Sequence, residues 1–217
     1  MLKIYYVWQR PVRITHWINV LSIIMLSITG FFIGSPYMTA PDTSMYIMGW
    51  MRMLHFSFAY LFTVSVAARI IWMFLGNHHA SWRAFVPWVT AKGLQDFIKM
   101  FSYYTFLSRD ITYEKGHNAV AATAYLGIFA LFVFQILSGF AIYGQFAPGG
   151  FWDGLLGGLN VMVGVQWLRL LHHGVMWLLI GFLINHVYSG WLMDVMCRNG
   201  TMSGIVSGYR YIEPEDV

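Results

Sequence analysis

The chain has 217 residues, of which 58% are hydrophobic and only 10% are charged. Because charged residues make up about 25% of an ordinary soluble domain, this composition excludes a water-soluble domain of this size. The net charge of +4 reflects how cations are placed around membrane segments, and it indicates no nucleic-acid partner. A single cysteine, Cys197, excludes an internal disulfide, a CxxCH haem attachment and a self-contained iron–sulfur cluster.

Four long runs with almost no charge predict membrane-spanning helices. Two runs, 14–41 and 118–152, carry no charge, and two others, 53–75 and 154–193, carry one arginine each. Each is long enough to cross a bilayer, which takes about 20 apolar residues. The predicted spans are about 14–36, 50–76, 117–145 and 164–196. They predict an all-α fold, an integral membrane four-helix bundle that forms a single membrane domain over 1–217.

The loop between the second and third spans contains a further periodic segment, AKGLQDFIKMFSYYTFL, at 91–107. One face is apolar and consists of Leu94, Phe97, Ile98, Phe101, Tyr104 and Thr105. The polar side carries Lys92, Gln95, Asp96 and Lys99. This pattern predicts an amphipathic helix on the cytoplasmic membrane surface. A helix that packs within the loop itself fits the same pattern equally well.

The positions of lysine and arginine predict the orientation in the membrane. Ten of the 13 fall in the N-terminal segment, the loop between the second and third spans, and the C-terminal segment. The others are Arg52 and Arg169 on the opposite side and Arg69 inside the second span. Because cytoplasmic segments carry the excess of these residues, we expect a multi-pass membrane protein with both termini and this loop in the cytoplasm.

Histidines are placed at two levels of the predicted bundle. Six of the eight lie on or at the edges of the spans: His16, His55, His117, His172, His173 and His186. His172 and His186 are separated by about 21 Å of helical rise and only about −40° of rotation, so they share a face. His173 is rotated by about 220° from His186 and is expected to point away.

Together with the first two spans, this helix predicts two pairs of facing histidines. His16/His186 would lie at the cytoplasmic level and His55/His172 at the outer level. Paired neutral imidazoles in an apolar bundle are the ligand set of bis-histidine haem b. The pattern therefore predicts two haems b, with these four histidines as iron ligands. For any single histidine, a structural hydrogen bond or a proton relay is the alternative, as in a haem-free transporter or membrane anchor.

Arginines accompany three of these histidines at a fixed spacing. The motifs are RITH (Arg13, His16), RMLH (Arg52, His55) and RLLH (Arg169, His172). Each arginine lies one turn nearer the membrane surface, where it would pair with a haem propionate. Membrane anchoring explains Arg13 well, but it explains Arg52 and Arg169 poorly because they lie on the outer side. Arg69 follows His55 by 14 residues and is a candidate partner of the inner haem. Gly30 has the same spacing from His16, and a glycine permits close approach of a porphyrin or a helix.

Five longer motifs extend over the chain: PVRITHW, GWMRMLHFSFAYLFTVSVAARIIWMFLGN, EKGHNAVAATAY, HHGVMWLLIGFLINHVYSGW and SGIVSGYRY. With these motifs the chain resembles the b-type cytochrome subunit of membrane-bound nickel–iron hydrogenases over essentially its whole length. The four-helix plan is also similar to the gamma subunit of membrane formate dehydrogenases and to a wider set of di-haem cytochromes b. The second-span and GHN motifs favour the hydrogenase branch.

This resemblance implies an electron-transfer role in the bacterial inner membrane. The partners would be the small and large hydrogenase subunits on the periplasmic side, with electrons passing through the outer and then the inner haem to membrane quinone. The chain has no cysteine set for a nickel–iron centre, so its part in a hydrogen:quinone oxidoreductase would be limited to quinone reduction. A di-haem cytochrome b subunit of another membrane oxidoreductase, such as formate dehydrogenase, is the alternative.

The resemblance also bears on Arg169 and on the quinone site. The family can carry another histidine three residues before the outer ligand of the fourth span, whereas this chain has Arg169 there. His117 and Asn118 are candidates for the quinone site near the cytoplasmic face, with Lys115 and Asp194 as proton carriers. Capping of the third span is an equally good explanation of His117 and Asn118.

Overall fold

The structure is a computed structural model that describes residues 3–39, 42, 44–109 and 118–212. The chain forms two compact units, each assembled from segments distant in sequence. The first unit consists of Met1–Ile14, Arg69–Ala130 and Phe182–Val217, and the second of Thr15–Ala68 and Leu131–Gly181. The single domain expected from the sequence stays a prediction.

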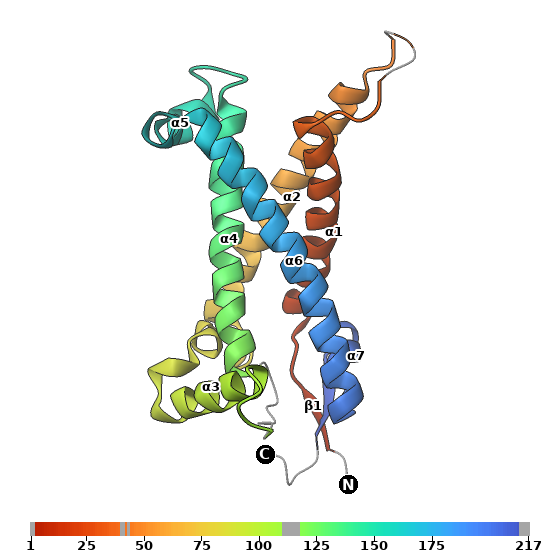
Figure 1. Cartoon of the computed structure of the whole chain (residues 1–217), viewed down its shortest axis with the longest axis vertical. Helices are drawn as coiled ribbons and strands as arrows, with labels where there is room; N and C mark the ends of the chain where they lie inside the picture. Colours follow the sequence, from red (N-terminus) through yellow and green to blue (C-terminus); the bar gives the residue numbers. More distant parts are fainter. Residues whose placement is uncertain (1–2, 40–41, 43, 110–117, 213–217) are drawn as a thin grey trace. The chain divides into compact units, whose positions relative to one another are not determined.

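Within the described ranges, four helices are long and apolar enough to cross a membrane. They are α1 (Arg10–Gly34), α2 (Ile47–Leu75), α4 (Ala119–Gly144) and α6 (Val165–Cys197) (Figure 1). The shortest has 25 residues, which gives about 37 Å of helix against a hydrocarbon core of about 30 Å. The prediction of a predominantly helical protein with four candidate spans is confirmed. α1 begins earlier than expected, because Pro11 is tolerated in a first helical turn.

The remaining elements are short. α3 (Ala91–Tyr104) confirms the helix predicted in the loop, and Thr90 caps it by accepting a hydrogen bond from the Gly93 amide at 3.1 Å. The sequence did not predict α5 (Phe151–Val163), α7 (Thr201–Ser207), or the strands β1 (Lys3–Tyr6) and β2 (Tyr209–Ile212). Two 3₁₀ turns, η1 (Trp82–Phe85) and η2 (Pro87–Val89), precede α3.

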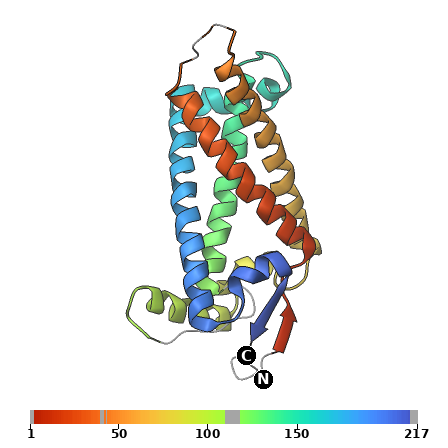
Figure 2. The same cartoon turned by 90° about the vertical axis from the view of Figure 1, so that its right-hand side faces the viewer.

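The first unit joins the two ends of the chain. β1 and β2 pair antiparallel, with Tyr6 opposite Tyr209, and they lie side by side in Figure 2. The amides of Val7 and Trp8 both donate to the Gly208 carbonyl. Gly208 has a φ of +94°, a conformation that favours glycine. A two-stranded ribbon is marginal on its own, and a small core of Val7, Trp8, Val12 and Ala80 supports this one.

A polar cluster ties the N-terminal segment to the chain after α2. The Gln9 Oε1 atom accepts hydrogen bonds from Trp72 Nε1 and from the Asn77 amide, both at 2.9 Å. Asn77 Nδ2 donates to the Val7 carbonyl at 3.0 Å, and its Oδ1 accepts from the Ala80 amide at 3.0 Å. Asn77 therefore satisfies backbone groups of two segments that are far apart in sequence.

The C-terminal segment is fastened to the end of α6. Asp194 Oδ1 accepts a hydrogen bond from the Thr201 amide at 2.7 Å, and Arg210 donates to Thr201 Oγ1 at 2.7 Å. Burial lowers the pKa of the Arg210 guanidinium, while the neighbouring Cys197 and Asp194 act in the opposite direction. These contacts explain how a short strand can follow a membrane helix closely.

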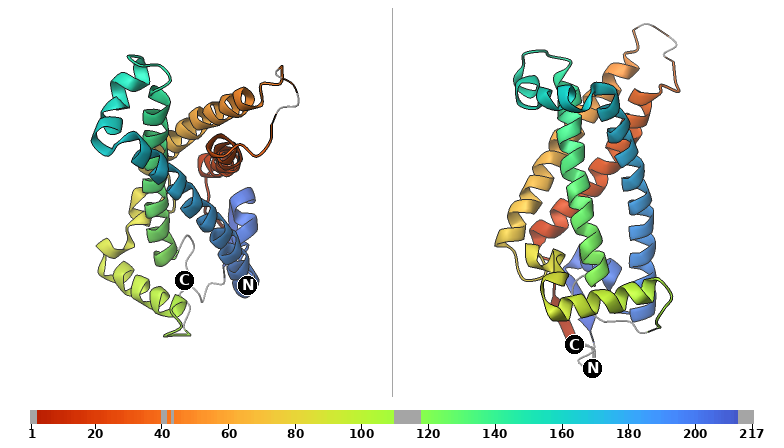
Figure 3. Two further views of the ribbon diagram at one scale, coloured as in Figure 1. Left: turned by 45° about the horizontal axis from the view of Figure 1, so that its top comes forward. Right: turned by 60° about the vertical axis from the view of Figure 1, so that its left-hand side comes forward.

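The second unit contains most of α1 and α2, the later half of α4, all of α5 and the first half of α6. α5 follows the end of α4, as Figure 3 shows in teal. Trp152 of α5 stacks on Phe140 of α4 at 3.9 Å, with an angle of 13° between the rings. Its Nε1 donates to the Tyr60 hydroxyl of α2 at 2.7 Å. Asn160 Nδ2 donates to the Ala141 carbonyl at 2.7 Å, so both ends of α5 are attached.

Replacing Asn77 by alanine should destabilise the first unit. The variant leaves the Val7 carbonyl without its side-chain donor, and an unsatisfied buried group costs about 1–3 kcal/mol. We expect the free energy of unfolding in detergent to fall by that amount, measured by chemical denaturation. Lys99→Gln on the exposed side of α3 is the control, and equal stability of the two variants would contradict the assignment.

Candidate functional site

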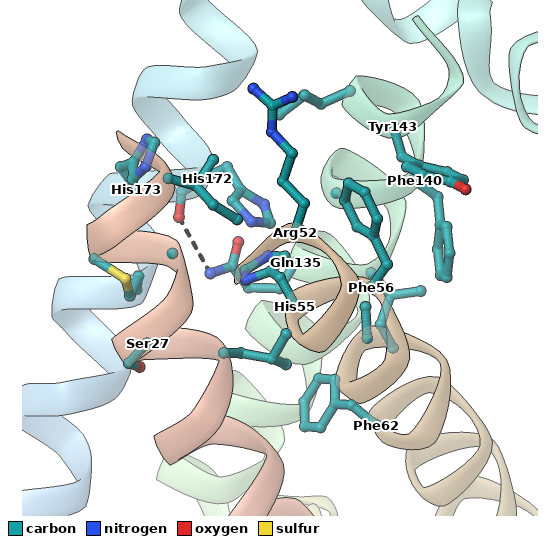
Figure 4. A pocket seen from close by; sticks show the side chains of 18 of the residues that line it. Ser27, Arg52, His55, Phe56, Phe62, Gln135, Phe140, Tyr143, His172 and His173 are labelled. Atoms are coloured by element: carbon teal, nitrogen blue, oxygen red, sulfur yellow. Dashed lines mark hydrogen bonds between the residues drawn. The ribbon is translucent and has the colours of Figure 1, made fainter. Parts of the chain in front are cut away.

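A cavity of about 420 Å³ lies within the second unit. Cofactor and small-molecule sites typically measure about 300–1,000 Å³. α1, α2, α4 and α6 all contribute to its lining, which is mostly apolar. His55, His172 and His173 are all at this cavity, together with Arg52 and Gln135 (Figure 4).

His55 presents one ring nitrogen to the protein and keeps the other available. Its Nδ1 lies 2.9 Å from Thr29 Oγ1, and the same hydroxyl lies 2.7 Å from the Met25 carbonyl. A hydroxyl carries one hydrogen and a carbonyl can only accept, so Thr29 donates to Met25 and accepts from His55 Nδ1–H. This hydrogen-bond pattern leaves the lone pair on Nε2, which can bind a metal.

His172 is held in the same way from α4. Its Nδ1 lies 2.8 Å from Ser138 Oγ, and that hydroxyl donates to the Gln135 carbonyl at 3.3 Å. The Gln135 side chain donates in turn to the backbone carbonyl of His172 at 3.1 Å, as the dashed line in Figure 4 shows. The proton of His172 is again placed on Nδ1, and Nε2 is available.

Glycines let the imidazole rings approach the neighbouring helices. A Cβ atom on Gly30 would lie 3.4 Å from Cε1 of His55, and one on Gly139 would lie 3.2 Å from Cε1 of His172. The close approach predicted at Gly30 is therefore to a histidine of α2. These contacts leave little room for a side chain beside either ring.

The expectation that His173 points away from the site was wrong. His173 lines the same cavity as His172, and a Cβ atom on Gly34 would lie 2.9 Å from its Nε2. Neighbouring residues of a helix differ by only about 100°, so a cavity that extends from α1 to α4 admits both. His173 Nδ1 donates to the Arg169 carbonyl at 3.0 Å.

The four predicted arginines fall into two groups. Arg52 and Arg169 line the cavity, and within the described part of the chain neither guanidinium donates a hydrogen bond or forms an ion pair. Arg52 lies 5.5 Å from the centre of the Phe146 ring. Both guanidiniums are therefore available to an anionic group.

The other two arginines bind backbone carbonyls in the first unit. Arg13 donates to the Val206 carbonyl. Arg69 is buried and donates from both terminal nitrogens to the Ala80 carbonyl, at 3.2 and 3.3 Å. The rings of Phe85 and Phe129 lie 5.4 and 5.8 Å from its guanidinium. The predicted role of Arg69 at an inner haem stays a prediction.

The members of the predicted inner pair belong to different units. His186 is in the first unit, where its Nδ1 lies 3.1 Å from the Tyr125 hydroxyl and its ring stacks on Phe182 at 5.4 Å. His16 is in the second unit, with its ring edge-on to Trp17 at 5.3 Å. The pairing of His16 with His186 stays a prediction.

The predicted quinone-site residues are only partly described. His117 and Lys115 lie outside the described residues. Asn118 caps α4, because its Oδ1 accepts a hydrogen bond from the Ala121 amide at 2.8 Å. Its Nδ2 donates to the Tyr104 hydroxyl at 3.1 Å. The capping role considered for Asn118 is therefore present in the structure.

The donor set of the cavity fits a b-type haem. Two histidines from facing helices offer Nε2 atoms, the walls are mostly apolar, and two arginines are available for propionates. Among the described residues, no cluster of three or more His, Cys, Asp or Glu side chains could hold a bare metal ion. Thr29, Ser138 and Gln135 were not predicted from the sequence. Thr29 and Ser138 each stand directly before a glycine, but so does Ser189 of α6, and nothing in the sequence marks Gln135.

Comparison with known proteins also indicates a b-type cytochrome. The chain matches the family described as prokaryotic cytochrome b561 over residues 7–208. It is 41% identical over 214 residues to a probable Ni/Fe-hydrogenase B-type cytochrome subunit of Cupriavidus necator, covering 96% of this chain and 88% of that protein. The probable Ni/Fe-hydrogenase 1 B-type cytochrome subunit of Escherichia coli K12 is 36% identical, covering 95% and 90%. A relative from Rhizobium leguminosarum is 33% identical, covering 97% and 90%.

Trp152 should support the cavity wall, because Tyr60 and Phe140 both line the cavity and both contact its indole. Trp152→Phe keeps an aromatic ring for stacking and should cost about 1 kcal/mol for the lost hydrogen bond. Trp152→Ala should cost about 3 kcal/mol. Chemical denaturation in detergent measures both, with the exposed Met162→Ala as the control. Equal costs for the two Trp152 variants would show that the ring does not stack in the folded protein.

Proposed function

The chain belongs to the prokaryotic cytochrome b561 family, and on this premise we propose that it is the haem b electron-transfer subunit of a membrane-bound nickel–iron hydrogenase. The observation that carries the proposal is the pair His55 and His172, which share one apolar cavity and keep their Nε2 atoms available. The names of the relatives, all B-type cytochrome subunits of Ni/Fe-hydrogenases, support the choice of complex over a formate dehydrogenase.

Each part of the cavity has a task in this role. His55 and His172 would hold the iron from two helices, and Arg52 and Arg169 would neutralise the propionates. The apolar lining excludes water, which keeps charge interactions strong in the cavity. When bound, haem b supplies an iron that accepts and returns one electron.

A second haem b would be held by His16 and His186. The spacing of His172 and His186 along α6, about 21 Å of rise, supports two haems at two depths of the membrane. The Tyr125 hydroxyl would orient His186, since it lies 3.1 Å from Nδ1. Two sites at this separation would connect the two surfaces of the bilayer.

Both termini would lie in the cytoplasm of a multi-pass inner-membrane protein. The pairing of β1 with β2 and the bonds of Asn77 to the N-terminal segment support a common side for both termini and the chain after α2. The excess of lysine and arginine in these segments supports the cytoplasmic side. On α3, Leu94, Ile98 and Phe101 are exposed, as expected for a helix on the membrane surface.

With this orientation, the hydrogenase small and large subunits would bind on the periplasmic side, and quinone would be reduced near the cytoplasmic face. The side chain of Asn118 is engaged by the α4 cap and by Tyr104, which favours His117 as the polar group of the quinone site. Asp194 accepts a hydrogen bond from the Thr201 amide. Proton transfer through this carboxylate would compete with that hydrogen bond.

Haem content tests the proposal directly. We expect two haems b per chain in the purified complex, measured by pyridine haemochrome and reduced-minus-oxidised spectra. His172→Ala should retain one, because it loses an iron ligand of the outer site. His173→Ala is the matched control on the same helix and should retain two, since the Nε2 atom of His173 lies against Gly34 of α1.

The other outcomes are equally informative. Loss of a haem in His173→Ala and not in His172→Ala would exchange the roles of the two neighbours. One haem in the unaltered complex would contradict the two-site arrangement and keep the electron-transfer role. A complex that binds no haem would overturn the proposed function.

A further inference from the structure

Each of the two cavity histidines is contacted by a dipeptide of the same form on another helix. Thr29 and Gly30 of α1 contact His55, and Ser138 and Gly139 of α4 contact His172. We propose that these two hydroxyl–glycine pairs are positioning residues that fix the tautomer and the ring plane of His55 and His172, and so would set the redox potential of the haem held there. The inference rests on the proposed function, because it assumes haem in this cavity.

The hydroxyls are oriented as acceptors by their own helices. Thr29 directs its hydrogen to the Met25 carbonyl, one turn earlier on α1, and Ser138 directs its hydrogen to the Gln135 carbonyl on α4. Both residues are only 1% exposed, so water does not compete for them. With its hydrogen directed to that carbonyl, each hydroxyl oxygen accepts from the histidine Nδ1–H. The opposite tautomer would require the hydroxyl to turn its hydrogen away from the carbonyl and toward Nδ1.

The glycines define where the ring lies. Cε1 is bonded to Nδ1, so the hydroxyl and the next residue act on adjacent atoms of one ring edge. A Cβ atom would stand 3.4 Å from this edge at Gly30 and 3.2 Å at Gly139. The hydroxyl holds the edge close, and the glycine leaves it room. Together they restrict rotation of the imidazole about its Cβ–Cγ bond.

On α4 the contact extends to the backbone of α6. The Gln135 side chain donates to the His172 carbonyl, so α4 holds both the backbone and the ring of this residue. Loss of the Ser138 hydroxyl should therefore release the ring while the helix stays in place. Gln135 Oε1 is buried and has no hydrogen-bond partner among the described residues, which leaves it as an acceptor at the same cavity.

A hydrogen bond from Nδ1–H raises the basicity of the ligating nitrogen. A more basic ligand stabilises ferric iron more than ferrous iron and lowers the midpoint potential. A neutral hydroxyl acceptor has a smaller effect than a carboxylate would have, because it carries no charge. The hydroxyl pairs should therefore hold the outer haem at a potential above that of a carboxylate-supported site and below that of an unsupported one.

The test compares variants of the whole purified complex. Ser138→Ala and Thr29→Val remove one acceptor each, and Ser138→Thr keeps it. Gly139→Ala keeps the hydroxyl and displaces the ring by a few tenths of an ångström. Ser65→Ala is the matched control, since Ser65 is also a buried hydroxyl of this unit but donates to the Thr15 carbonyl. The readouts are the midpoint potential, the largest EPR g value, which depends on the angle between the ligand planes, and the rate of haem loss.

Ser138→Ala and Thr29→Val should raise the midpoint potential and speed haem loss, whereas Ser138→Thr and Ser65→Ala should match the unaltered protein. Loss of a group that hydrogen-bonds a metal-binding histidine typically costs 10–100-fold in metal affinity. If ferric affinity alone falls tenfold, the potential rises by about 59 mV. Gly139→Ala should change the g value. Complete haem loss in Ser138→Ala that Ser138→Thr restores would also support the proposal.

The failures of this inference and of the proposed function are separable. If Ser138→Ala and Thr29→Val bind haem with unchanged potential, g value and rate of haem loss, the positioning role is overturned and the electron-transfer function stands. A shift of equal size in Ser65→Ala would also overturn it, because any buried hydroxyl would then have the same effect. If the unaltered complex binds no haem, the proposed function falls, and this inference falls with it.

Discussion

Hydrocarbon offers no hydrogen-bond partner, so every polar atom on a membrane helix must be satisfied within the protein or by a ligand. The second unit meets this constraint at His55 and His172 with hydroxyls from the neighbouring helices. Those hydroxyls are satisfied in turn by carbonyls of their own helices. Only one nitrogen of each ring is left over. The cavity therefore presents two nitrogen lone pairs within an apolar lining. These are the features that binding of an iron porphyrin requires.

The same constraint separates the arginines by role. Arg69 is buried, and its charge is accommodated by the Ala80 carbonyl and two aromatic rings. Its guanidinium therefore attaches the segment after α2 to that helix. Arg52 and Arg169 have no such acceptor within the described residues and lie at the cavity. An arginine bound to a carbonyl stabilises the fold, whereas Arg52 and Arg169 are available for the carboxylates that the proposed function would bring to the cavity.

The four long apolar helices and the grouping of His55 with His172 at one cavity could be predicted from the sequence. Charge-free runs and helical spacing are both set by residues that are near one another in the chain. β1 and β2 could not be predicted, since they pair across almost the whole chain. α5 was not predicted because it contains three glycines, which are poor helix formers, and because it runs into a long apolar segment. His173 was misplaced because a helical rotation gives the direction of a side chain and not the width of the cavity that it faces. For Arg69, the sequence places the residue on a helix face but does not show which carbonyl folds back to meet it.

The role of a hydroxyl–glycine dipeptide cannot be assigned from the sequence alone. The chain has five such dipeptides, beginning at Thr29, Ser138, Ser189, Ser203 and Ser207. Ser189 donates its hydrogen to carbonyls of its own helix, and its glycine faces Met202. Gly208 instead supplies a turn with positive φ. A hydroxyl residue followed by glycine can therefore serve helix packing, form a turn, or hold a histidine ring. What distinguishes Thr29 and Ser138 is a histidine on another helix at the same depth, and only the tertiary structure brings the two together.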